Sequence, residues 1–451
     1  MEYLLPEVLN EWSNYRNESF INATNNEESF KQIQKNNQNS IATRFLLEYV
    51  AASKIQGSKH VQKTDMEHLL SICILIIEWA QRSDQFKYNL VKSNLTMLKS
   101  NRIGVKESDF YEINRAMHNS QKFYLNFDDK TQPNFNMFSE EVNRKSNELL
   151  VDAFTEMFGF SNVEFNSTIS LICNIFYGHF NTIIVGDKEE LINTLESSPD
   201  AELSSVVIRK VIDVLLSLER NDFLEPPKGN SKFDVLPWRF NRDLSFIRKP
   251  IVEYDNKLYF GVRNIMYAKT YLYNLIFRGK LKTKNKKMKV FMSEIRNQIG
   301  KDFNMSVAEM IRQNPLLEVF TEVKKIGKKK ITNDNGDDLG DIDILVINKS
   351  KKKIFVIETK EFSDSRNPYD IAMEIKSIYG EGKSFQSKHF NRTKWIIDHK
   401  KEIIDFYSLK KGSWKIEPLF IFSEYLISKH LIKNSKIKCI SLGEITKKSF
   451  T

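Results

Sequence analysis

The sequence predicts an α+β protein with more than one domain. A chain of 451 residues is long enough for two to four domains of ordinary size. Apolar residues recur at three-to-four spacing through much of the first half, as in amphipathic helices. From Met288 onward, a helical pattern is followed by strand-like apolar runs, more helices and more strands. That order is typical of one compact α/β domain, so we expect helices to dominate the first part and an α/β domain to end the chain.

The first expected region, residues 1–245, is mainly helical and suits a regulatory, scaffolding or oligomerising role. A polar stretch with Asp, Asn and Pro, Lys122–Phe138, marks a possible subdivision of it. Helical spacing is found at Thr43–Ser53, Met66–Arg82, Phe138–Phe158, Ser167–Phe180 and Ser204–Glu219.

A short unit over residues 246–285 is expected to connect the two regions. Lys249–Val262 is apolar on both sides of Asp255 and Asn256, which predicts a β-hairpin. A helix over Arg263–Phe277 follows. The basic segment Gly279–Lys289 then predicts a hinge, and we place the main domain boundary there.

The last expected domain, residues 286–451, alternates helices and strands. A helix over Val290–Gln313 stops before Pro315, because proline cannot continue it. Further helices are expected at Tyr369–Tyr379 and Ser384–Phe406. Strands are expected at Leu317–Lys324, Asp341–Asn348, Lys353–Lys360, Ile416–Phe422 and Ile437–Ser441.

Charge is unevenly distributed along the chain. Residues 281–451 contain 35 Lys and Arg against 22 Asp and Glu, so they carry +13, and the first 280 residues carry −3 of the total of +10. A basic region gains affinity for a polyanion by counterion release, which indicates nucleic acid as a partner. A lysine-rich solvated surface is the competing interpretation.

Cysteine usage and the first residues point to the cytoplasm. Cys73, Cys173 and Cys439 are far apart and lie in apolar runs, without a CxxC pair, so buried reduced thiols are expected rather than a zinc site. The first fifteen residues lack the basic and apolar segments of a signal peptide. The longest apolar stretch, Leu69–Ala80, is too short to span a bilayer, so no membrane association is expected.

The segment Gly336–Glu361 contains the residues that suggest chemistry. Side chains alternate between the two faces of a strand, so Asp341 and Asp343 share a face, as do Glu358 and Lys360. The short link between the two strands predicts a hairpin that brings Asp343, Glu358 and Lys360 together. Solvated ion pairs at the edge of a hairpin are the alternative.

These residue types suit the hydrolysis of a phosphodiester bond. Asp343 and Glu358, with the carbonyl of Thr359, offer hard oxygen ligands to a divalent cation. Such a cation polarises the phosphate and lowers the pKa of a bound water. Lys360 is suited to orient the nucleophile and to offset negative charge that develops in the transition state.

The segments GDIDILVI and FVIETK resemble the PD-(D/E)XK, or restriction-endonuclease-like, nuclease superfamily. The resemblance covers about residues 288–445 and implies a central mixed sheet flanked by helices, with dependence on Mg²⁺ or Mn²⁺. It implies that Asp343 and Glu358 bind the metal and that Lys360 is the catalytic lysine. Asp341 lies where many members have another acid, so it is a further candidate ligand, beside the Thr359 carbonyl.

Two weaker correspondences belong to the same resemblance. Members often have a QxxxY-like helix after the lysine strand, and Gln386 with Phe390 lies in that place. Gln386 would then position a phosphate or a metal-bound water, unless it only belongs to an ordinary polar helix face. Members also often have an acid on the first helix, where this chain has Asn304; Glu294 or Glu309 are possible substitutes.

Other features have competing interpretations. Trp238 to Lys249 interleaves basic and aromatic residues, which suits either a nucleic-acid grip or a linker that packs its aromatics. His389 and His399 are ten residues apart, so they are expected to be packed or surface residues rather than metal ligands. The chain has no GxxxxGK[ST] loop and is not itself a P-loop ATPase.

The favoured function is that of a Mg²⁺-dependent DNA endonuclease. DNA is favoured over RNA on the superfamily resemblance alone. A nuclease fused to a large helical region resembles prokaryotic antiviral or restriction factors, in which the fused region controls assembly or activation. A homo-oligomer and a partner protein or trigger are therefore expected. The alternative is a catalytically silent nucleic-acid-binding or adaptor protein that acts with a partner ATPase or nuclease.

Overall fold

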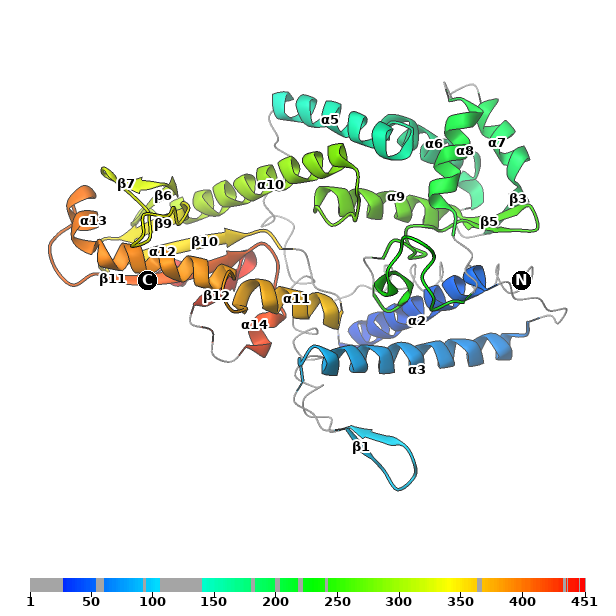
Figure 1. Ribbon diagram of the computed structural model, residues 1–451, viewed down its shortest axis with the longest axis horizontal. Coiled ribbons are helices and arrows are strands. Elements are labelled where there is room, and N and C mark those ends of the chain that lie inside the picture. Colours follow the sequence, from blue (N-terminus) through cyan, green and yellow to red (C-terminus); the bar gives the residue numbers. More distant parts are fainter. Residues whose placement is uncertain are drawn as a thin grey trace. The chain divides into compact units, whose positions relative to one another are not determined.

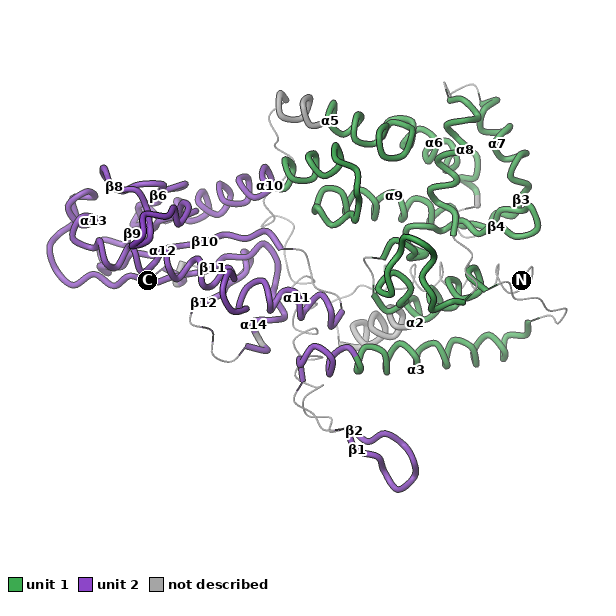
Figure 2. The backbone as a smooth tube through the Cα atoms, in the orientation of Figure 1, with its two compact units in different colours: residues 1–83, 138–296 green, residues 84–137, 297–451 purple. Residues whose placement is uncertain are grey.

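The chain forms two compact units, shown in Figure 2. Unit 1 comprises residues 1–83 and 138–296, and unit 2 comprises residues 84–137 and 297–451. The computed structural model describes residues 27–53, 61–91, 95–105, 140–179, 183–198, 203–217, 222–239, 242–362, 367–432, 435, 437–445 and 447–450. The subdivision expected near residues 122–138 lies outside them.

Unit 1 is mainly helical, as expected, with a small antiparallel sheet of order β3-β5-β4 (Figure 1). The last turn of α3 and the second half of α10 belong to unit 2. The helices are α2 (Glu27–Ala52), α3 (Lys63–Lys87), α5 (Glu140–Phe158), α6 (Asn162–Ile175), α7 (Lys188–Glu196), α8 (Ser205–Leu215), α9 (Val262–Phe277) and α10 (Lys286–Arg312). Two short 3₁₀ turns, Tyr177–His179 and Lys232–Val235, and the strands β3 (Ile183–Asp187), β4 (Val252–Tyr254) and β5 (Lys257–Gly261) complete it.

The expected hairpin at Lys249–Val262 is confirmed as β4 and β5. Asp255 and Asn256 form its turn with φ of 51° and 57°, a left-handed conformation that Asn and Asp tolerate better than most residues. The helix that follows is also confirmed, as α9. In the segment expected to be a hinge, Leu281 is buried and α10 already begins at Lys286.

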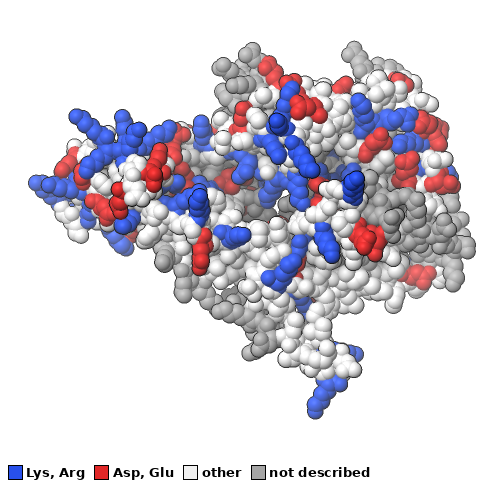
Figure 3. Space-filling model, in the orientation of Figure 1, with Lys and Arg blue, Asp and Glu red and all other residues white. Residues whose placement is uncertain are grey.

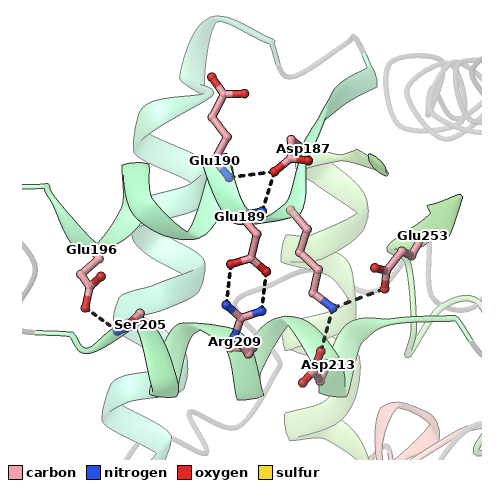
Figure 4. A network of polar contacts seen from close by, with 9 residues as sticks. Asp187, Glu189, Glu190, Glu196, Ser205, Arg209, Asp213 and Glu253 are labelled. Atoms are coloured by element: carbon pink, nitrogen blue, oxygen red, sulfur yellow. Dashed lines mark hydrogen bonds and ion pairs between the residues drawn. The ribbon is translucent and has the colours of Figure 1, made fainter. Parts of the chain in front are cut away.

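A polar network joins α7, α8 and β4 (Figure 4). Asp187 caps α7 by accepting hydrogen bonds from the amides of Glu189 and Glu190. Arg209 on α8 binds both carboxylate oxygens of Glu189 and lowers the pKa of that carboxyl. Lys188 reaches acidic groups on both α8 and β4. Exposed ion pairs of this kind orient the helices but add little to stability.

The segment from Trp238 to Lys249 packs into unit 1. Arg242 is fully buried and holds the carboxylate of Glu48 on α2 with two hydrogen bonds of 2.6 Å. Phe246 belongs to the hydrophobic core between α2, α3 and the sheet, and Trp238 packs against that core. Of the two interpretations of this segment, the structure agrees with packing.

Unit 2 is built on a five-stranded mixed sheet of order β12-β11-β10-β9-β6. The pairs β6–β9 and β9–β10 are antiparallel, whereas β10–β11 and β11–β12 are parallel. The α+β fold class and the expected mixed sheet are thus confirmed. The strands are β6 (Leu317–Val323), β9 (Ile342–Asn348), β10 (Lys353–Lys360), β11 (Lys415–Phe422) and β12 (Lys438–Ser441).

Helices cover both faces of this sheet (Figure 1). On one face, Phe303, Val307 and Ile311 of α10 pack against strand residues such as Val346 and Phe355. On the other face, helices α12 and α13 contribute Trp395, Ile396 and Ile403, which pack against Leu345 and Val356. We call the face covered by α12 and α13 the α12 face of the sheet. Because side chains alternate along a strand, the odd-numbered residues of β9 and the even-numbered residues of β10 lie on it.

The remaining elements of unit 2 are short. One expected helix, Ser384–Phe406, is interrupted at His399, so it forms α12 and α13. The helices are α11 (Pro368–Tyr379), α12 (Phe385–Asp398), α13 (Lys400–Phe406) and α14 (Ser428–Leu431), with 3₁₀ turns at Leu442–Glu444 and Lys447–Phe450. Two small hairpins pair β1 (Leu95–Met97) with β2 (Ile103–Val105) and β7 (Lys325–Ile326) with β8 (Lys329–Lys330). Within the described parts of the chain, no helix is both long and apolar enough to cross a membrane.

Candidate active site

Asp343 and Glu358 lie opposite each other where the β9–β10 ladder ends. The last paired residues are Ile344 and Ile357, and the same register continued by one residue pairs Asp343 with Glu358. The apolar residues that follow Asp343 on β9 and those that precede Glu358 on β10 are buried, which fixes the register and hence the faces. Both carboxylates therefore point to the α12 face of the sheet, and Lys360 follows on that face.

The structure brings the three expected residues into contact. Lys360 Nζ lies 2.7 Å from Glu358 Oε1 and 3.8 Å from Asp343 Oδ2. Asp343 Oδ2 also accepts hydrogen bonds of 2.7 Å from the amide of Thr359 and of 3.2 Å from its hydroxyl. The backbone between Glu358 and Lys360 is thus part of the same cluster.

Arg392 on α12 is a fourth member, which sequence reasoning missed. Its Nη1 donates to Glu358 Oε2, and its Nε donates to the carbonyl of Leu339 at 2.7 Å. Phe385, His389 and Arg392 follow each other at three-to-four spacing, so they share the helix face that packs on the sheet. The one feature of the sequence that could have indicated this role is the positive charge of Arg392 on the helix face that packs on the sheet. The name "carboxylate cluster" is used below for Asp343, Glu358, Lys360 and Arg392.

The two carboxyl groups of the cluster are in different electrostatic environments. Burial, and then the neighbouring charge of Glu358, raise the pKa of Asp343 to about 6. Burial also acts to raise the pKa of Glu358, but Lys360 and Arg392 outweigh it and hold this pKa below its usual value. The ionised form of Asp343 is therefore the one that lacks compensation.

His389 lies next to the cluster with only 1% of its surface exposed. Burial is the largest cause that lowers its pKa, to about 4, so the imidazole is neutral at physiological pH. Neither ring nitrogen has a hydrogen-bond partner of normal geometry among the described residues, and the ring packs on Phe420 at 4.9 Å. This agrees with the expectation of a packed histidine. His399, by contrast, stacks on Trp395 at the end of α12.

The further candidate site residues, Asp341 and Gln386, do not contact the cluster. Asp341 is half-buried and precedes β9; no hydrogen bond or ion pair to the cluster is found for it among the described residues. Gln386 accepts a hydrogen bond of 3.5 Å from Ser435 instead. Gln386 follows Phe385 by one residue and is rotated by about 100° from it around the helix, away from the face that carries Arg392. In the structure, Gln386 therefore does not contact the cluster, and its proposed role stays a prediction.

Among the described residues, neither Asn304 nor its two candidate substitutes contacts the cluster. Asn304 is buried on α10, beside Phe303 and so on the opposite face of the sheet, and its Oδ1 lacks a hydrogen-bond partner among the described residues. Glu294 and Glu309 are both exposed. In the part of the chain that the structure describes, no group of three or more His, Cys, Asp and Glu side chains is arranged to hold a metal.

The cluster fits a divalent cation in its chemistry. Two adjacent carboxylates and the Thr359 carbonyl are hard oxygen donors of the kind that Mg²⁺ and Mn²⁺ prefer. Burial and the neighbouring carboxylate of Glu358 raise the pKa of Asp343, so a cation bound between the two carboxylates would favour its ionised form. Because both oxygens of Glu358 contact Lys360 and Arg392, a cation would have to share or replace these contacts.

Comparison with known proteins identifies the family. Residues 20–425 match the family model described as "Anti-phage protein Upx-like". The chain belongs to the Upx-like anti-phage family. The match to the Upx-like model covers most of both units and includes every member of the carboxylate cluster. The antiviral-defence part of the expectation is confirmed at the level of this family. Neither the curated proteins nor the solved structures give a significant match.

Proposed function

We propose that this Upx-like protein is a metal-dependent endonuclease that hydrolyses phosphodiester bonds in DNA. The observation that carries the proposal is the convergence of Asp343, Glu358 and Lys360 on one face, where β9 begins and β10 ends. This is the arrangement of a carboxylate pair and a lysine that the PD-(D/E)XK resemblance implies. Family membership supports the antiviral role, and the positive charge of residues 281–451 supports a polyanionic substrate.

Asp343, Glu358 and the Thr359 carbonyl would hold Mg²⁺ or Mn²⁺. The cation supplies Lewis-acid polarisation of the phosphate and a water of lowered pKa. Lys360, already 2.7 Å from Glu358, would orient the attacking water and offset charge on the phosphoryl oxygens. Arg392 binds the other oxygen of Glu358 and anchors the loop at Leu339, so it fixes the position of the carboxylate.

Unit 1 is proposed to control when unit 2 cuts. Uncontrolled cleavage would harm the host, so assembly into a homo-oligomer, a partner protein or a trigger is expected to regulate it. Asp341 remains a proposed additional metal ligand that would have to move to reach the cation, and Gln386 would need a rotation of its side chain to approach a phosphate.

The direct test is cleavage by the purified full chain. Plasmid DNA, single-stranded DNA and RNA are incubated with Mg²⁺, Mn²⁺ or EDTA, and products are separated on gels. We expect DNA cleavage with either metal, none with EDTA, and a loss of at least a hundredfold in Lys360→Ala. Lys351→Ala is the matched control, because Lys351 is exposed in the turn between β9 and β10. Absence of cleavage under all conditions, or equal activity in Lys360→Ala, would refute the proposal.

A second function is favoured by a different observation. The cluster already balances two carboxylates with two cations, so it can be stable without a metal. A catalytically silent protein that binds nucleic acid, or an adaptor for a partner ATPase or nuclease, would need no more. For such a protein we expect binding without cleavage and a melting temperature that Mg²⁺ does not change.

A further inference from the structure

A hollow of about 550 Å³ lies between β8, the loop after it and the outer side of α12. This volume falls within the range of sites for small organic ligands. Thr332 and Leu339 line it from the loop, and Lys394, Trp395 and His399 line it from α12 or the residue that follows it. The name "α12 hollow" is used below for this site, which lies entirely in unit 2.

Lysines give the α12 hollow an affinity for phosphate. Lys330 and Lys394 line it, are exposed, and form no ion pair with the described residues, whereas Lys329 is paired with Glu402 at 2.6 Å. The rim continues into a group of exposed lysines at residues 324, 325 and 328–330. Figure 3 shows Lys and Arg gathered over this end of unit 2, at the left of the view. A backbone phosphate would be attracted to the two unpaired ammonium groups.

The lining also contains groups that suit a base better than a phosphate. Asp334, Asp398 and Asn391 are exposed around the α12 hollow. Carboxylates repel a free phosphate or sulfate, but they accept hydrogen bonds from the amino and imino groups of nucleobases. A nucleotide, with a phosphate at one end and a base at the other, therefore matches the lining better than an inorganic anion.

The α12 hollow shares a wall with the carboxylate cluster. Leu339 lines the hollow, and its carbonyl accepts the 2.7 Å hydrogen bond from Nε of Arg392. The same guanidinium binds Glu358. Gly340, with φ of 80°, lets the loop approach Arg392, since a Cβ there would lie 3.2 Å from Nη2. Leu339 therefore links the lining of the hollow to the guanidinium that holds Glu358.

From this arrangement we infer that the α12 hollow binds one nucleotide of the DNA strand that is cut. Lys330 and Lys394 contact its phosphates, and Asp334, Asn391 and Asp398 contact its base. The inference rests on the proposed nuclease function for the identity of the strand, but binding can be measured without cleavage.

The test measures binding of a fluorescent 20-nucleotide single-stranded DNA by anisotropy, in EDTA, over a range of KCl concentrations. The full chain is compared with the double variant Lys330→Ala/Lys394→Ala. The control is Lys351→Ala/Lys411→Ala, which removes the same charge from exposed positions away from the hollow. Each phosphate contact contributes about 0.7 to the salt slope of single-stranded binding, so two contacts predict a loss of roughly 1.4 in slope and roughly 25-fold in affinity at 0.1 M salt.

The control is expected to stay within about twofold of the parent protein. Equal losses in both double variants, or none in either, would overturn the inference. Tight binding of an RNA 20-mer with the same lysine dependence, but not of DNA, would overturn the choice of DNA. If the Lys330→Ala/Lys394→Ala variant cleaves normally and its binding is unchanged, only the proposed role of the α12 hollow is refuted. Lysine-dependent binding without any cleavage by the parent protein refutes only the nuclease.

Discussion

Replacing Asp343 with Asn should stabilise unit 2 while it abolishes metal binding. Burial and the charge of Glu358 raise the pKa of Asp343 from 3.8 to about 6. A difference of about two pH units corresponds to about 3 kcal/mol against the ionised form at neutral pH. The side chain is 19% exposed, so solvent screening reduces this to about 1–3 kcal/mol.

The sign follows from proton binding. Between about pH 4 and pH 6 the folded protein binds more protons at Asp343 than the unfolded chain, so its stability falls as the pH rises through this window. The asparagine side chain of the Asp343→Asn variant carries no charge and can still accept the Thr359 amide hydrogen bond. The variant should therefore be more stable than the parent protein at pH 7.5, with a melting temperature about 4–8 °C higher, and nearly equal at pH 4.

Calorimetry in EDTA at both pH values checks this expectation, with Asp341→Asn as the control because that half-buried acid makes no hydrogen bond or ion pair with the cluster among the described residues. Adding Mg²⁺ should raise the melting temperature of the parent protein and leave that of Asp343→Asn unchanged. A variant that is less stable at pH 7.5, or equally stabilised at both pH values, would refute the assigned electrostatics. Equal stabilisation of both proteins by Mg²⁺ would refute Asp343 as a ligand.

Three further substitutions test other contacts. Arg392→Ala leaves Glu358 Oε2 unpaired and should cost about 2–3 kcal/mol of stability, measured by urea unfolding. Mg²⁺ should reduce this loss, and no effect of Mg²⁺ would contradict competition between Arg392 and a metal. Arg242→Ala removes both Arg242 hydrogen bonds from the buried carboxylate of Glu48 and should cost about 3–5 kcal/mol. Arg242→Met/Glu48→Met should cost less, and an additive loss would argue against the ion pair. Gly340→Ala forces a side chain into a left-handed backbone against Arg392 and should cost about 1–2 kcal/mol by thermal melting; a neutral result would show that the loop relaxes.

Strand periodicity explains why the core of the site could be predicted. Residues of β9 and β10 alternate between the sheet faces, and the apolar residues at Ile344 and Ile357 fix the register, so the face of Asp343 and Glu358 follows from the sequence alone. The helix patterns of α9, α10 and α11 were equally regular, and their predicted ranges agree with the structure to within a few residues. Local patterns were sufficient for these elements.

Long-range packing explains what could not be predicted. Arg392 reaches Glu358 because helix α12 packs on the sheet with one particular rotation about its own axis. The spacing of residues in the sequence does not fix that rotation. The same rotation turns Gln386 toward Ser435. The strand β3 was not predicted because its partner, β5, lies some seventy residues further along the chain. The break at His399 could not be predicted either, since no proline or glycine marks it.

The charge balance of the carboxylate cluster implies an order of events for the proposed enzyme. Two carboxylates against Lys360 and Arg392 make the cluster formally neutral when Asp343 is ionised. Entry of a divalent cation changes this to +2 without any other change in protonation. The empty site would therefore offer little attraction to a phosphodiester, and the loaded site a strong one. Ion loading would therefore add affinity for the phosphate that is cut, beyond the metal-free binding expected of the α12 hollow.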